Sequence, residues 1–294
     1  MSNAHNIPSP AAEPIGLPVS FEVYPPRKPE LTDALHETIQ RLATVNPAFI
    51  SVTYGAGGSS RDATLDCVRY IRDNTSVEPM AHLTCVSATH AEATALVGEF
   101  LDAGVRSFLA LRGDAPEGTL EGEDFLGDLK NATALVELIR ELQPAGEQVT
   151  VGVATFPNGH PESTTVDQDI QTLLAKQAAG ANLAITQLFF YAEEYLTFVE
   201  KALAAGVSIP ILPGIMPVIS PARLKRMVEI SGEAMPLDLQ AALEAETTAE
   251  GQRAIGVAHA ANLARELIAG GAPGIHLYAF NQSGPVLEVL QHLS

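Results

Sequence analysis

Polar side chains capable of acid–base or ion-binding chemistry recur where short apolar runs of this chain end. In "FEVYPP", Glu22 stands just before two prolines, although Glu is a poor strand residue. Carboxyl and imidazole groups are the usual proton donors and acceptors of enzymes, and guanidinium groups bind carboxylates and phosphates. The residues of interest near the run ends are Glu22, Thr53, His82, Arg112, Gly113, Asp114, His160, Gln187, Tyr278 and Asn281.

Eight apolar runs alternate with amphipathic stretches, a pattern typical of strands alternating with helices. The runs cover residues 19–24, 49–55, 79–85, 107–113, 149–156, 183–190, 209–217 and 274–280. Between them apolar residues recur at i, i+3 and i+4, and several stretches end in glycine, a common helix stop. The alternation predicts a parallel sheet, and about eight units in one chain predict a (β/α)8 TIM barrel.

The segments outside this rhythm set the expected organisation. The stretch 218–273 is longer than one strand–helix unit, so we expect extra helices before the last strand. Residues 1–17 lack the basic and apolar regions of a signal peptide, and we expect a flexible N-terminal leader. Residues 18–294 contain no linker rich in Pro, Gly or Ser and are predicted to form one barrel domain.

The predicted barrel brings the polar residues together, because active sites of such barrels lie at the carboxyl ends of the strands. Each residue alone has a structural explanation as well. Glu22 can pair with an arginine, His82 can be a hydrogen-bonded core histidine, and Arg112 can form an ion pair with Asp114. Their joint place at one rim favours a functional site.

The composition restricts the expected partners and surroundings. The chain has 294 residues and a formal net charge of −18, whereas nucleic acids and anionic membranes require a basic surface. Neither is therefore an expected partner. Cys67 and Cys85 lack the spacing of a zinc site, so we predict buried free thiols, no metal and a cytoplasmic location.

The segment "TYGAGGSSRD" after the second run is an ambiguous signal. A glycine-rich loop can bring backbone amides close to a phosphate. This one is neither a dinucleotide-binding fingerprint nor a phosphate-binding loop, and flexibility alone explains it. Ser59 or Ser60 can also cap the following helix.

An ordered set of motifs resembles the methylenetetrahydrofolate reductase family. The matching segments are "FEVYPPR", "SVTYGAGGSSRDAT", "AHLTC", "ALRGD", "PNGHPE", "GANLAITQLFFYAEEYLTF", "IPILPGIMPV" and "HLYAFN". They appear in the order typical of the family, which has a (β/α)8 barrel fold. The resemblance therefore agrees with the fold predicted from the strand count.

The resemblance implies reduction of 5,10-methylenetetrahydrofolate to 5-methyltetrahydrofolate in one-carbon and methionine metabolism. Electrons would come from NADH or NADPH, normally through bound FAD. The methylene bridge opens to an iminium when the leaving nitrogen is protonated, and a carboxylic acid with a raised pKa can do this. The family's acid matches Glu22, and desolvation at an apolar mouth would raise the pKa of its carboxyl. Asp114 matches a carboxylate suited to stabilise the cation.

Other residues match contacts of the family. Gln187 resembles a glutamine that hydrogen-bonds the pterin, and we expect Tyr278 and Asn281 to join it in binding substrate. The expected cofactor-binding residues are Thr53, His82, Arg112, Gly113, Asp114, His160, Asp169 and Lys176.

Three departures from the family pattern concern FAD. Asn131 and Ala134 stand in "NATAL", where many members have Tyr and Asp. Gln282 replaces a usual Arg, which removes a bidentate donor suited to a carboxylate or phosphate. Two hypotheses follow: FAD is bound through other contacts, or hydride passes directly from NAD(P)H to the iminium.

Other functions stay open at this stage. The same site could work in reverse, oxidising methyltetrahydrofolate, or the chain could bind folate without catalysis. Glu22, Asp114 and Gln187 favour catalysis, because a pure binding protein needs no acid. The choice of NADH or NADPH is not set, since no ribose-reading Rossmann fingerprint is present. Helix faces of such barrels often pair, so a homo-oligomer is considered with no face assigned.

Overall fold

The computed structural model describes residues 17–26, 28–54, 61–115, 118–119 and 125–293. The expected leader lies outside these residues except for Leu17. Residues 55–60 of the glycine-rich segment, including both candidate capping serines, also lie outside them. The proposed domain limits therefore stay a prediction.

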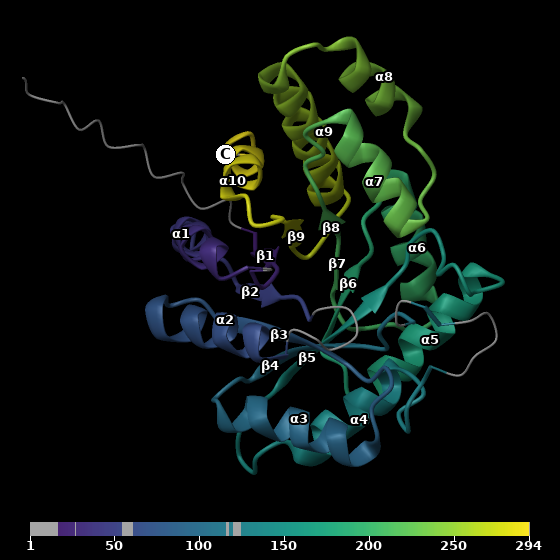
Figure 1. Cartoon of the computed structure of the whole chain (residues 1–294). Helices are drawn as coiled ribbons and strands as arrows, with labels where there is room; N and C mark the ends of the chain where they lie inside the picture. The colour runs from purple at the N-terminus through teal and green to yellow at the C-terminus, as the bar shows by residue number, and fades with distance from the viewer. Residues whose placement is uncertain (1–16, 27, 55–60, 116–117, 120–124, 294) are drawn as a thin grey trace, which may run out of the picture.

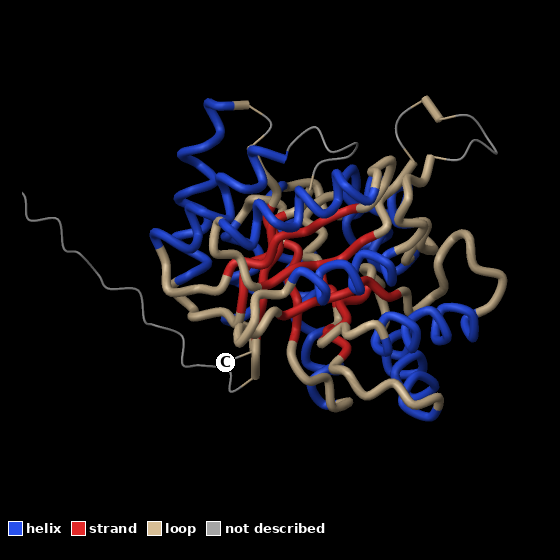
Figure 2. Tube along the Cα trace, turned by 90° about the horizontal axis from the view of Figure 1, so that it is seen from below, coloured by secondary structure: helices blue, strands red, loops and turns tan. Residues whose placement is uncertain are grey.

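The strands form one parallel sheet that curls into a barrel (Figures 1 and 2). Its order is β7-β6-β5-β4-β3-β2-β1-β9-β8. The strands are β1 (Val19–Val23), β2 (Phe49–Val52), β3 (Pro79–Thr84), β4 (Ser107–Leu111), β5 (Thr150–Thr155), β6 (Leu183–Thr186), β7 (Ile211–Leu212), β8 (Gly214–Ile215) and β9 (Ile275–Tyr278).

The seventh predicted run, 209–217, contains both β7 and β8. Pro213 separates these two short strands and has no N–H to offer a sheet. β7 pairs with β6 and β8 pairs with β9, so the ring of strand pairings closes through this one run. Nine labelled strands in the described part thus correspond to the eight predicted ones, and the expected barrel is confirmed.

Helices cover the outside of the barrel, as Figure 1 shows. Three of them, α7, α8 and α9, stand between β8 and β9, which confirms the extra helices expected before the last strand. A further helix, α10, follows that strand and packs beside α1 and α9, although no helix was predicted there. The helices are α1 (Thr32–Ala43), α2 (Arg61–Asn74), α3 (His90–Asp102), α4 (Ala132–Leu142), α5 (Val166–Ala178), α6 (Ala192–Ala204), α7 (Pro221–Ser231), α8 (Leu237–Ala245), α9 (Ala249–Ala269) and α10 (Ser283–Gln291), with a short 3₁₀ helix at Pro29–Leu31.

Helix starts follow local sequence signals. The Thr89 hydroxyl accepts from Glu92 N while the Glu92 carboxylate accepts from Thr89 N, which is a capping box at the start of α3. At the start of α4, Asn131 Oδ1 accepts from Ala134 N at 3.0 Å. Asn131, one of the departures from the family pattern, therefore has a structural function as a helix cap.

The outer face of the barrel strands and the inner faces of the helices share the large core. A smaller apolar cluster consists of Phe49, Met80, Leu109, Ile185 and Leu212, which come from β2, β3, β4, β6 and β7. Because side chains of a strand alternate between its faces, this separate cluster fills the barrel interior. Residues two positions further along these strands also point inward, nearer to the carboxyl end.

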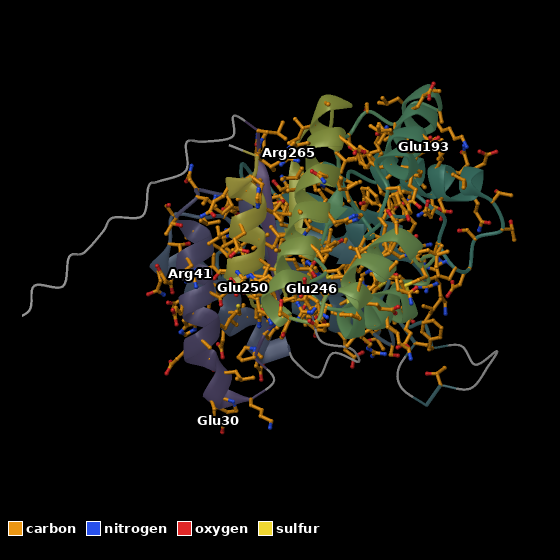
Figure 3. The ribbon with its side chains drawn as sticks, turned by 90° about the horizontal axis from the view of Figure 1, so that it is seen from above. Glu30, Arg41, Glu193, Glu246, Glu250 and Arg265 are labelled. Carbon is orange, nitrogen blue, oxygen red and sulfur yellow. The ribbon has the colours of Figure 1, made fainter. Side chains whose placement is uncertain are left out.

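The acidic charge lies on the periphery. Glu30, Glu193 and Glu250 are exposed, and Figure 3 labels Glu30 and Glu193 toward the edges of the molecule. None of the described helices combines the length and the apolar character needed to cross a membrane.

Asn281 joins the end of β9 to the end of β1. Its Oδ1 accepts from Tyr24 N at 2.9 Å and its Nδ2 donates to Tyr24 O at 2.8 Å. Its backbone is left-handed, with φ of 55°, a conformation that asparagine tolerates better than most residues. These contacts give Asn281 a structural function, and its expected contact with substrate stays a prediction.

We expect Asn281→Ala to lower the free energy of unfolding by about 2–4 kcal/mol, because it removes two partly buried hydrogen bonds and places alanine in the left-handed region. Asn46→Ala is the matched control. Asn46 also has a positive φ, of 49°, but its exposed side chain makes no hydrogen bond within the described residues. The control should lose about 1 kcal/mol in urea unfolding. Equal losses would contradict the bridging function of Asn281.

Candidate active site

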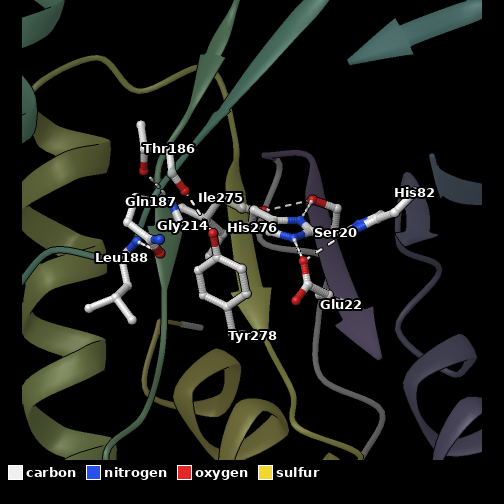
Figure 4. Close-up of polar contacts among 10 residues, drawn as sticks. All are labelled: Ser20, Glu22, His82, Thr186, Gln187, Leu188, Gly214, Ile275, His276 and Tyr278. Carbon is white, nitrogen blue, oxygen red and sulfur yellow. Dashed lines mark hydrogen bonds and ion pairs between the residues drawn. The ribbon is translucent and has the colours of Figure 1, made fainter. Parts of the chain in front are cut away.

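Glu22 stands at the carboxyl end of β1 between two buried histidines (Figure 4). Its Oε2 lies 3.6 Å from His82 Nε2 on β3 and 3.8 Å from His276 Nε2 on β9. The Glu22 side chain is 20% exposed, so it remains open to the barrel mouth. Within the described residues, no lysine or arginine forms an ion pair with it. Among the described residues, the ion-pair partners in range of the carboxyl are therefore two histidines and not a permanent cation.

The strand register explains this convergence. Ser20 pairs with His276 and Glu22 with Tyr278, and all four lie on the inward face that alternation assigns them. Ser51 follows Phe49 by two positions and His82 follows Met80 by two, so both stand directly above the apolar interior cluster. The inward side chains of Ser20, Ser51, His82 and His276 therefore form a polar group beside and below Glu22.

His82 is buried and neutral. Burial lowers its pKa to about 4, against the opposing attraction of Glu22 and with a smaller contribution from His276. A neutral imidazole leaves Glu22 without a stabilising cation on this side. This residue was expected to contact a cofactor, and the structure places it beside the expected acid.

Tyr278 connects the end of β9 to β6. Its hydroxyl donates to Thr186 O at 2.7 Å, while Thr186 Oγ1 accepts from Gly214 N at 2.9 Å (Figure 4). A Cβ on Gly214 would lie 2.6 Å from the Tyr278 hydroxyl, so glycine is required there. Burial, and secondarily Glu22, raises the pKa of Tyr278 well above its usual value. Tyr278 therefore stays protonated as a donor.

Gln187 follows Thr186 and brings an amide to the mouth. Its Oε1 accepts from Leu188 N at 2.8 Å, which fixes the orientation of the side chain. Gln187 also lines a cavity of about 560 Å³. The cavity is large enough for a substantial part of a ligand of drug or cofactor size.

Most of the expected cofactor-binding residues line this cavity. They are Arg112, Gly113, Asp114, His160, Asp169 and Lys176. Asn131 and Ala132, at the amino end of α4, line it too, and a helix amino end favours a bound anion. Neither Thr53 nor His82 is among the lining residues.

Arg112, Lys176 and Asp169, three charged residues of the cavity, each have polar partners. Arg112 makes a bidentate contact with Glu162, with Nη2 2.9 Å from Oε1. Lys176 Nζ donates to Ala154 O at 2.8 Å, and burial lowers the pKa of this lysine to about 8, against the attraction of Asp169. Asp169 accepts from Ser163 Oγ and His160 N. The cavity thus offers cationic donors and ordered backbone suited to an anionic ligand.

Sequence reasoning missed Ser20, Ser51, Thr186 and His276. For His276 a signal was available, because it precedes Tyr278 by two residues and must share its face of the strand. The same rule connects Ser20 with Glu22. Nothing in the sequence showed that Thr186 would accept from a tyrosine 92 positions later.

The parallel barrel carries converging polar groups and a cavity at the carboxyl ends of its strands. This is the arrangement of an active site in a TIM-barrel enzyme. A sequence profile described as methylenetetrahydrofolate reductase matches residues 12–294. The chain belongs to the methylenetetrahydrofolate reductase family.

Individual relatives agree with this assignment. The chain is 34% identical to the 5,10-methylenetetrahydrofolate reductase of Salmonella typhimurium, over 90% of this chain and 86% of that protein. It is 32% identical to methylenetetrahydrofolate reductase (NADH) 1 of Arabidopsis thaliana, over 93% of this chain and 48% of that protein. The chain therefore corresponds to about half of the plant enzyme.

Solved structures share the fold at lower identity. An uncharacterized protein from Clostridium thermocellum that binds two copies of 5-methyl-5,6,7,8-tetrahydrofolic acid superposes with a TM-score of 0.65 and 14% identity, covering 94% of this chain and 93% of that one. The phosphoenolpyruvate phosphomutase of Streptomyces platensis subsp. rosaceus gives 0.53 at 12% identity, over 94% and 82%. At such identities the likeness concerns the fold alone.

The buried, neutral state of His82 makes stability depend on pH. The unfolded chain binds a proton at this histidine near its ordinary pKa of 6.5, whereas the folded protein does so only near 4. Acid therefore favours unfolding: the full stability is present above pH 6.5 and is lost as the pH falls toward 4. When the pH falls from 7.5 to 5, the free energy of unfolding of wild type should drop by about 2 kcal/mol more than that of His82→Gln.

Urea unfolding at both pH values measures this difference. His292→Gln is the control, because His292 is exposed near the end of the chain. It should follow wild type within about 0.5 kcal/mol. If His82→Gln and wild type lose the same free energy of unfolding between pH 7.5 and 5, His82 is not held neutral in the folded protein.

Proposed function

We propose that this chain reduces 5,10-methylenetetrahydrofolate to 5-methyltetrahydrofolate, with NADH or NADPH as the electron source. The observation that carries this proposal is the place of Glu22. Its carboxyl stands at the mouth of a family-typical barrel between two buried histidines, and no lysine or arginine in the described part of the chain forms an ion pair with it. A carboxylic acid in such surroundings is suited to donate a proton.

The proposed reaction begins with proton transfer from Glu22 to the leaving nitrogen of the methylene bridge. The carbon–nitrogen bond breaks and its electron pair stays on that nitrogen, so an iminium forms at the other nitrogen. Hydride then adds to the methylene carbon, and the nicotinamide is oxidised. In this scheme Asp114, which lines the cavity, stabilises the cation, and Gln187 binds the pterin by hydrogen bonding.

The residues of the cavity fit a flavin cofactor in chemical type. Arg112, Lys176 and the amino end of α4 would hold an anionic group such as a pyrophosphate. Asp169 and His160 would border it. A bound FAD would carry hydride between the nicotinamide and the folate. Asn131 stands where many family members have tyrosine, so this chain lacks an aromatic ring at that position. The start of α4 stays intact, because the Asn131 side chain caps the helix.

We also propose a cellular location and partners for the enzyme. Both cysteines are free and buried, as is usual in a reducing compartment, and we place the enzyme in the cytoplasm. A folate and a nicotinamide are the proposed partners, and a homo-oligomer is included without an assigned face.

Glu22→Gln should lower kcat for methylenetetrahydrofolate reduction at least 100-fold, because glutamine cannot deliver the proton. Folate binding should change only a few-fold, since the amide keeps the size of the side chain. Glu30→Gln, at an exposed position on the 3₁₀ helix, is the control and should keep full activity. A near-wild-type rate in Glu22→Gln would disprove the assignment of the acid.

Absorption spectra of the protein, taken before and after FAD incubation and desalting, test the cofactor. We expect flavin bands at near-equimolar amount and about tenfold weaker retention in Arg112→Gln, which loses a bidentate cation. Arg226→Gln, which removes an exposed charge on α7, should retain flavin normally. Reductase activity without any bound flavin would instead establish direct hydride transfer from the nicotinamide.

A further inference from the structure

His276 lies inside the barrel with one ring nitrogen bonded and the other without a partner. Its side chain is fully buried, stacked at 5.7 Å on Phe49 and in edge contact at 5.3 Å with Tyr278. Nδ1 lies 2.8 Å from Ser20 Oγ. Nε2 makes no hydrogen bond within the described residues and faces Glu22 Oε2 at 3.8 Å (Figure 4). The two aromatic rings keep the imidazole in this orientation.

The contacts of Ser20 decide which nitrogen carries the hydrogen. The Ser20 hydroxyl lies 3.3 Å from Ile275 O and can donate its single hydrogen there, which leaves its oxygen to accept from His276 Nδ1–H at 2.8 Å. The other tautomer would place a buried N–H at Nε2, and its nearest acceptor among the described residues, Glu22 Oε2 at 3.8 Å, is beyond hydrogen-bond distance in this arrangement, so the donor would be left unpaired at a cost. We therefore assign the Nδ1–H tautomer, which leaves a bare lone pair at Nε2.

A bare ring nitrogen suits only one form of the neighbouring carboxyl. A carboxylate would place two acceptors face to face, whereas a protonated carboxyl can donate to Nε2. We propose that Ser20 and His276 are positioning residues that present this lone pair to Glu22 and hold its carboxyl in the proton-bearing form. This inference rests on the proposed function of Glu22 as the acid.

The chain of contacts runs from the main chain to the site: Ile275 O, Ser20, His276 and then Glu22. The gap between Nε2 and Oε2 must close by less than 1 Å, and catalytic hydrogen bonds commonly shorten when substrate binds. Among the described residues, the other titratable groups that face Glu22 are His82 from β3 and Tyr278 from β9. Burial keeps His82 neutral and Tyr278 protonated, so neither opposes the proton-bearing form with a charge.

The first test reads the tautomer without using activity. The chain has eight histidines, and ¹⁵N-histidine labelling with long-range ¹H–¹⁵N spectra distinguishes Nδ1–H, Nε2–H and imidazolium forms. His276→Asn identifies the resonances of His276. We expect the Nδ1–H form at pH 7.5 in wild type and a loss of this preference in Ser20→Ala. An Nε2–H or charged ring in wild type would overturn the proposal.

The second test uses the geometry of two amides. Glutamine at position 276 can place its carbonyl oxygen near the site of Nε2, whereas asparagine reaches only the site of Nδ1. We expect His276→Gln to keep kcat within about threefold and His276→Asn to lose about tenfold at pH 7.5, with folate KM changed less than threefold in both. The alkaline midpoint of the kcat–pH profile should move about one unit lower in His276→Asn.

A merely structural function would lower kcat equally at all pH values in both variants, and that result would also overturn the proposal. Failure of the proposed function gives a different result: wild type would then reduce no methylenetetrahydrofolate with either nicotinamide. In that case the tautomer spectrum alone decides whether the Ser20–His276 arrangement exists. Similar urea midpoints for the two variants would ensure that the rates compare folded proteins.

Discussion

The alternation of side chains along each barrel strand is the constraint on which the site depends. The same period that sends Phe49 and Met80 into the apolar bottom of the barrel sends Ser51 and His82 into the layer above. Glu22 pairs with Ser51 on one side and with Tyr278 on the other, near the mouth. A slip of one residue in any of these strands would turn its polar residue into the helix-covered core. Register therefore preserves both the fold and the chemistry.

The closure of the barrel is coupled to the same residues. The run that contains β7 and β8 is interrupted at Pro213, so few hydrogen bonds connect this part of the ring. Tyr278, Thr186 and Gly214 add side-chain hydrogen bonds across the interruption. The hydrogen bond that supports the weakest part of the ring thus also fixes the tyrosine beside Glu22. Stability and site geometry cannot be separated at this position.

The sequence was enough to predict the barrel, the extra helices and the place of Glu22, because periodicity and strand order depend on local patterns. It could not show that the seventh strand is split, since a short apolar run around Pro213 looks continuous. Lys176 and Asp169 lie on a helix, and only the family resemblance indicated them. Asn281 was expected at the substrate, but whether its amide is occupied by Tyr24 depends on a contact between distant segments. Such pairings arise from the closed barrel.

The two sides of the mouth differ in charge. One side is suited to bind an anionic ligand, and the other is suited to keep Glu22 as a proton donor. On the side of β4, β5 and α5, Arg112 and Lys176 carry charges and stand next to Glu162 and Asp169. On the side of β1, β3 and β9, burial keeps His82 neutral, and no lysine or arginine of the described residues forms an ion pair with Glu22. A cation beside Glu22 would favour its carboxylate and remove the acid. An anionic ligand without cations would bind weakly. Charge interactions weaken with distance and with solvent access. Because the cations and Glu22 are on different elements of the barrel, one mouth can hold cations for an anionic ligand and still keep them away from Glu22.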